Sequence, residues 1–223
     1  MISKNSWYVG EIYIPHAKPS ITDGVTGVAG DMLSFIDQYE QEAIIKCFGY
    51  QLGREFISVL DITKTNGLVD LADTKWDELL NGKEYINPQG VLVKWEGVRR
   101  KFPLTATEPN FSLLCFYVYW FYEKNDHITR SGSGNQRNSP KNARVDDSFD
   151  KVTNAWRKFV KMVQGEELAP IIIEKEYGFG IDWYQGGQEI SLYKFIEDSN
   201  ILVPNTYPNF NPKKWKNVNQ LGI

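Results

Sequence analysis

The polar residues best able to do chemistry form a basic cluster in the second half of the chain. They are Lys124, Arg130, Arg137, Lys141 and Arg144. The only carboxylate among them is Asp126. Lysine and arginine attract phosphate groups at long range and without sequence preference. Three interpretations stay open for residues 129–145: a solvated flexible loop, a partner-docking segment, or a contact with DNA phosphates in a channel. The last two would use Arg130, Arg137, Lys141 and Arg144.

No combination of residues predicts an enzyme. Neither histidine, His16 or His127, stands at a metal-ligand spacing from cysteine or carboxylates. Asp146, Asp147 and Asp150 could bind a metal, but carboxylates at a helix start are explained more simply by the helix dipole. We therefore expect no catalytic, cofactor-binding or metal-binding residues and no cofactor. A small enzyme or regulatory binding domain with an unfamiliar site is the alternative from another class.

Composition narrows the class of protein further. The chain has 223 residues, of which 42% are hydrophobic and 14% aromatic, enough for a dense core or extensive interfaces. A formal net charge of −3 disfavours a generally basic nucleic-acid binder. Cys47 and Cys115 lie in apolar stretches and are expected to be buried free thiols. The most apolar stretch, 111–122, is shorter than the ~20 residues that span a bilayer, so we expect a soluble, cytoplasmically made protein.

Hydrophobic periodicity predicts the elements that position these residues. Residues 31–60 carry apolar side chains at three- and four-residue steps, which predicts a helix that Gly49 should kink or break. Residues 110–126 are apolar nearly all round, so their helix should be buried on several sides, in a bundle or an oligomer. Residues 148–164 predict a third helix. A short helical turn is expected at 74–80.

The expected fold class is mainly α. We predict a connector-like helical bundle over residues 31–165, with a small β-hairpin insertion at about 85–95, where two β-prone runs flank a Pro/Gly turn. Extended arms, residues 1–30 and 166–223, complete the chain.

The two arms should be mostly irregular. The first is punctuated by proline and glycine, with a short strand predicted at 8–14. The second predicts a strand at 170–173 and a short helix at 190–198. Its end spaces Tyr207, Phe210 and Trp215 between prolines. Such a tail is not expected to make its own core, and its rings could dock in grooves on a partner.

Several segments in fixed order resemble one family. They are residues 39–42 (YEQE), 46–52 (KCFGYQL), 79–85 (LLNGKEY), 93–97 (VKWEG), 116–126 (FYVYWFYEKND) and 151–159 (KVTNAWRKF). In order and spacing they resemble head–tail adaptor, or connector, proteins of tailed bacteriophages, of the kind found in crAss-like and other Bacteroidetes phages. The resemblance covers about residues 31–165 and carries no catalytic residues.

The resemblance implies a structural virion protein at the head–tail junction. Such adaptors form a ring, usually of twelve copies, beneath the portal and continue the DNA channel toward the tail. The implied partners are other copies of the chain, the portal, downstream tail or neck rings and, non-specifically, DNA, with no membrane. Another neck or tail ring component, such as a stopper or tail-hub protein, is the alternative.

Overall fold

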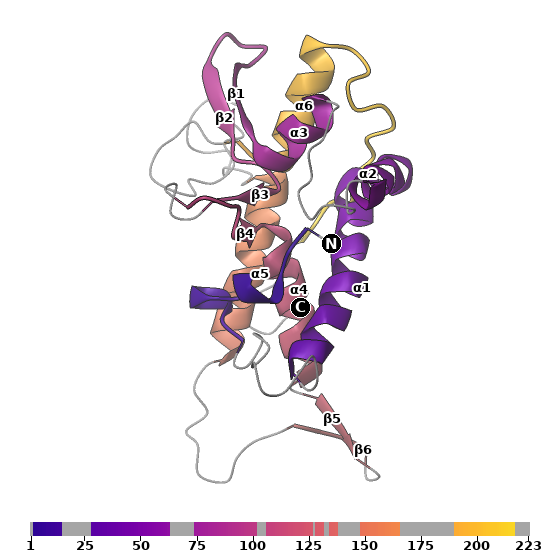
Figure 1. Ribbon diagram of the computed structural model, residues 1–223, viewed down its shortest axis with the longest axis vertical. Coiled ribbons are helices and arrows are strands. Elements are labelled where there is room, and N and C mark those ends of the chain that lie inside the picture. The colour runs from indigo at the N-terminus through magenta and orange to yellow at the C-terminus, as the bar shows by residue number, and fades with distance from the viewer. Residues whose placement is uncertain are drawn as a thin grey trace.

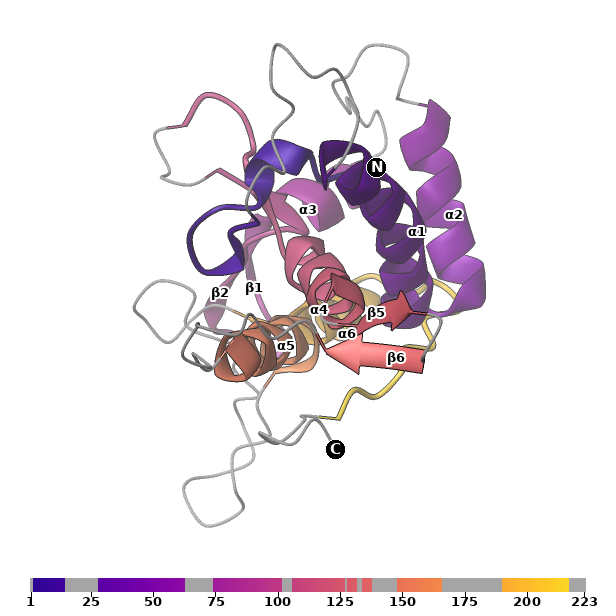
Figure 2. The ribbon, with the colours of Figure 1, turned by 90° about the horizontal axis from the view of Figure 1, so that it is seen from below.

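The computed structural model describes residues 2–14, 28–62, 74–101, 106–126, 128–131, 134–137, 148–165 and 190–216. In these ranges the chain is mainly helical, as expected. Three helices, α1 (Val28–Phe48), α4 (Leu114–Asp126) and α5 (Ser148–Gln164), lie side by side, with α4 between the other two (Figures 1 and 2). None of the helices described has both the length and the apolar character needed to cross a membrane.

Helix α4 lies at the centre of the core. Every side chain from Leu113 to Trp120 is buried, which confirms that this apolar helix is covered on several sides. The Tyr117 ring lies 5.1 Å from the Phe159 ring on α5. Both cysteines are buried free thiols, as predicted.

The predicted start of this helix at residue 110 is wrong. Phe111–Ser112 form a short strand, β4, which pairs with β3 (Arg99–Arg100). The Ser112 hydroxyl donates to the Val98 carbonyl at 2.9 Å and accepts the Leu114 N–H at 3.2 Å. The Ser112 hydroxyl accepts one of the otherwise unpaired N–H groups of the first turn, that of Leu114, and so caps the helix start at Leu114.

The break at Gly49 is confirmed. It separates α1 from α2 (Tyr50–Ile62), and Gly49 has a φ of +85°. A Cβ at this position would lie 2.7 Å from the backbone oxygen of Asn211. Only glycine combines this backbone angle with so close an approach.

The predicted hairpin is confirmed and stands beside two short helices. Helix α3 (Thr74–Asn81) leads into strand β1 (Lys83–Ile86), which pairs antiparallel with β2 (Leu92–Trp95). Helix α6 (Leu192–Leu202) confirms the helix expected near 190–198, and the Ser191 hydroxyl caps it. The strand predicted at 170–173 lies outside the described residues.

The strand predicted at 8–14 is wrong, because this segment forms two 3₁₀ turns, η1 (Asn5–Trp7) and η2 (Gly10–Ile12). Gly10 has a φ of +63°, which interrupts an extended strand. The segment is also no loose arm, since most of its large side chains enter the core. The buried ones are Ile2, Trp7, Tyr8, Ile12 and Ile14.

Candidate interaction surface

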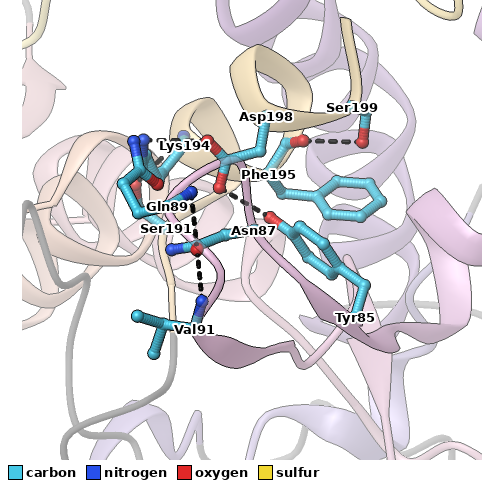
Figure 3. Close-up of polar contacts among 9 residues, drawn as sticks. All are labelled: Tyr85, Asn87, Gln89, Val91, Ser191, Lys194, Phe195, Asp198 and Ser199. Atoms are coloured by element: carbon cyan, nitrogen blue, oxygen red, sulfur yellow. Dashed lines mark hydrogen bonds and ion pairs between the residues drawn. The ribbon is translucent and has the colours of Figure 1, made fainter. Parts of the chain in front are cut away.

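Side-chain contacts join the β1–β2 hairpin and α6 into one unit (Figure 3). The Tyr85 hydroxyl donates to Asp198 Oδ2 at 3.0 Å, and Lys194 Nζ lies 2.8 Å from Asp198 Oδ1. Asp198 is fully buried. Burial, followed by the negative charge of Asp198, raises the pKa of Tyr85. The hydroxyl therefore stays protonated and keeps donating to the carboxylate, which links β1 to α6.

Aromatic packing strengthens the same junction. The Trp95 ring of β2 stacks on Phe195 of α6 at 5.6 Å, and the Tyr85 ring meets Phe195 edge-on at 5.8 Å. Such ring pairs add about 1 kcal/mol each beyond the area they bury. The hairpin is thus held against α6 along its inner face.

The hairpin tip is fixed by its own turn. The side-chain oxygen of Asn87 accepts the backbone N–H groups of Gln89 at 3.0 Å and Val91 at 2.9 Å (Figure 3). Gly90 supplies the positive φ, +81°, that the turn requires. The tip therefore has a defined shape rather than that of a mobile loop.

Exposed aliphatic side chains gather on this unit. Ile86 and Leu92 face each other across the hairpin and are 62% and 54% exposed. The end of α6 and the residue after it add further exposed side chains, Ile201, Leu202 and Val203. Both elements lie at the upper end of the molecule in Figure 1. We name these five residues the aliphatic end. A contiguous exposed apolar patch is typical of protein contact surfaces, and these five residues are the candidates for one.

The structure describes only part of the basic segment 129–145, namely residues 129–131 and 134–137. The structure shows a second hairpin at the opposite end of the molecule, formed by β5 (Ile128–Ser131) and β6 (Gly134–Arg137) (Figure 1). The start of this segment is therefore not a loop as predicted. Two residues separate the strands, a connection length typical of tight hairpins.

Two of the four candidate contact residues belong to this hairpin. Arg130 is in β5, opposite Asn135, and Arg137 ends β6, opposite Ile128. Their side chains, and all of Lys141 and Arg144, lie outside the described part of the structure. Their role in a partner or DNA contact stays a prediction.

The aromatic rings that were expected to dock on a partner pack against their own chain instead. Tyr207 is 1% exposed and Trp215 6%, and Phe210 is partly buried against the same core. The Tyr207 hydroxyl donates to the Lys75 carbonyl at 2.6 Å. Because the groove these rings fill is made by their own helices, they are not a free docking arm.

Trp215 packs among aromatic rings of α4 and α5. Its ring lies 5.2 Å from Phe159, and 5.7 Å from both Tyr117 and Trp156. Its Nε1–H donates to the Tyr193 hydroxyl at 2.7 Å. We name residues 203–216 the C-terminal strap, because they join α6, α5 and the end of α1.

The structure also contains a buried carboxylate that the sequence did not single out. Glu40 on α1 is 2% exposed and accepts the backbone N–H of Ile2 at 2.6 Å and of Ser3 at 2.9 Å. The Ser3 hydroxyl also donates to it. Burial raises the pKa of Glu40 against the lowering effect of these hydrogen bonds. A glutamate on the apolar side of a predicted helix was the only available signal.

The structure does not describe the side chains that the sequence offered as possible metal ligands. His16, His127, Asp146 and Asp147, and the side chain of Asp150, lie outside the described residues. In the ranges that are described, no three histidine, cysteine or acidic side chains come close enough to hold a metal ion.

No known protein-family model, curated protein or solved structure matches this chain.

Proposed function

We propose that this chain is a structural protein of a tailed-bacteriophage virion, a connector-like helical bundle that forms a ring adaptor between the portal and the tail and continues the DNA channel. The observation that carries the proposal is the ordered set of segments that resemble adaptor proteins. These segments fall on the break between α1 and α2, on α3 and its hairpin, on α4 and on α5. The resembling segments thus supply part of one helical core.

We place the contacts between neighbouring copies on a surface other than the aromatic tail that the sequence suggested. Most large side chains in the described part of the first arm, and the rings of Tyr207, Phe210 and Trp215 in the second, pack within the chain. The aliphatic end is the better candidate, since its side chains are exposed while the frame beneath them is fixed. Head-to-tail contacts that close into a ring bury such a patch against a different face of the next copy.

Oligomer state tests the proposal. Mass photometry of the purified chain with the portal of the same phage should show a multi-copy ring complex. The double substitution Ile86→Ser and Leu92→Ser should weaken this assembly, while changing the stability of the chain by only about 0.5 kcal/mol, because both side chains are exposed. Tyr50→Ser, at an exposed ring on α2, is the matched control. A chain that stays monomeric with portal present contradicts the proposal.

A stopper or tail-hub ring is the alternative within the same class. Chemical crosslinking of intact virions separates the two, because an adaptor must crosslink to the portal and a tail-hub protein must not.

A further inference from the structure

Hydrogen bonds to three helices hold residues 213–215 of the C-terminal strap. The Lys213 N–H donates to the Lys46 carbonyl of α1 at 2.9 Å, and the Lys213 carbonyl accepts the Tyr193 hydroxyl of α6 at 2.7 Å. Gln164 of α5 binds both backbone groups of Trp215 at 2.9 Å. The backbone of residues 213–216 therefore has a fixed place on the helical core, on the outside in Figure 2.

This anchoring presents three cations to solvent. Trp215 points inward and is buried, while Lys213, Lys214 and Lys216 are exposed. No aspartate or glutamate occurs between Asp198 and Lys216. None of the ion pairs among the described residues involves these three lysines. Lys213 Nζ instead lies 5.5 Å from the Trp215 ring centre, a contact that keeps its positive charge.

The neighbouring helix extends the positive charge. Gln164, which pins the strap, shares one stripe of α5 with Arg157 and Lys161, because residues spaced by three and four lie on the same helix face. Arg157 is exposed and Lys161 half-buried. Five cationic side chains thus border one stretch of surface on a protein whose net charge is −3.

We propose that this surface, the basic strap formed by Lys213, Lys214 and Lys216 with Arg157 and Lys161 beside it, binds the phosphate backbone of nucleic acid. Lysine is a compact point charge that suits phosphate without demanding a fixed hydrogen-bond geometry. Stacking on bases is not available, since the rings that contact these lysines, those of Trp156, Tyr193 and Trp215, are buried. Binding is therefore independent of sequence and strongly dependent on salt.

A membrane surface fits less well. Peripheral binding to lipid combines basic residues with exposed apolar side chains that enter the bilayer. Beside the three lysines the strap turns its aromatic ring inward. Phosphate contact without insertion favours nucleic acid over anionic lipid.

The test is the salt dependence of DNA binding by the full chain, followed by fluorescence anisotropy of a labelled duplex of arbitrary sequence. Three phosphate contacts predict a loss of at least roughly 40-fold in affinity between about 50 and about 200 mM salt. The triple variant Lys213→Gln, Lys214→Gln and Lys216→Gln should bind at least about 10-fold more weakly at low salt, and its log–log salt slope should be shallower by about 2 to 3. The triple arginine variant should retain binding, because it keeps the charges.

The matched control changes the net charge equally. Lys4, Lys101 and Lys151 are also exposed. The first two lie on other segments, and Lys151 lies in the first turn of α5, off the stripe that Arg157 and Lys161 share. Replacement of these three by glutamine should leave the salt slope unchanged. Equal losses in both triple variants, no binding of the wild type at low salt, or binding to phosphatidylserine vesicles in place of the duplex would each overturn the proposal. Ring assembly is measured separately and does not decide the outcome.

Discussion

Oε1 of Glu40 accepts the backbone N–H of Ser3 at 2.9 Å across a separation of 37 residues. The same carboxylate also holds the N–H of Ile2. One buried side chain of α1 therefore fixes the path of the N-terminal segment, whose rings then fill the space beside α4. This contact shows that the segment belongs to the folded core.

Replacement of Glu40 by alanine should destabilise the protein strongly. The change leaves two backbone N–H groups without their acceptor, and hydrogen bonds to a charged group contribute about 1.5–3 kcal/mol each. We expect the free energy of unfolding in urea to fall by about 3 kcal/mol. Glu55→Ala is the control, since its pair with Lys75 is 3.4 Å long and solvent-exposed, and should cost under about 0.5 kcal/mol. Equal losses in both variants would contradict the assigned role.

The raised pKa of Glu40 predicts a pH dependence. Since the folded pKa lies above the ordinary value of about 4.3, the folded state holds this proton more tightly than the unfolded state. Its stabilising effect is complete below the unfolded pKa and is lost as pH rises through the folded pKa. The free energy of unfolding of the wild type, relative to Glu40→Gln, should therefore decline as pH rises above about 4.3. A difference that rises with pH would show that the hydrogen bonds outweigh burial.

Alanine at Gly49 should cost more than alanine at Gly90. Both glycines have positive φ, +85° and +81°. At Gly90 a Cβ meets open space, whereas at Gly49 it meets the backbone of Asn211. Backbone strain of about 1–2 kcal/mol applies to both, and overpacking adds about 1–3 kcal/mol only at Gly49. Thermal unfolding of the two variants measures the difference, and similar midpoints would contradict contact between the strap and the helix break.

Trp215→Ala tests whether the strap completes the core. The substitution empties a site lined by Tyr117, Trp156 and Phe159, so the expected loss is about 3–5 kcal/mol in the free energy of unfolding. Phe at the same position keeps most of the packing and loses only the bond to Tyr193, about 1 kcal/mol. If the strap were detached in solution, both variants would unfold like the wild type in a urea titration.

Local periodicity was sufficient for the elements whose apolar residues repeat within one helix or hairpin. The bounds of α5 and the break at Gly49 follow from such patterns. The start of α4 does not, because Phe111 and Ser112 pair with Arg100 and Arg99, a contact that no helical repeat reveals.

The sequence also could not predict that the two terminal segments pack against the helical core of their own chain. Trp156 meets the Lys216 carbonyl across 60 residues, and nothing in the spacing of Tyr207, Phe210 and Trp215 shows whether their groove belongs to this chain or to another. The contact of Glu40 with Ile2 and Ser3 was missed for the same reason, since its donors are backbone N–H groups that any sequence supplies.

The position of Trp215 also bears on how the protein is made. The cluster around α4 and α5 stays open until residues near 215 have left the ribosome, although the helices that line it are synthesised much earlier. Nascent chains must therefore carry exposed aromatic surface until residue 215 has emerged, and chaperones that recognise such surface should associate with them until then.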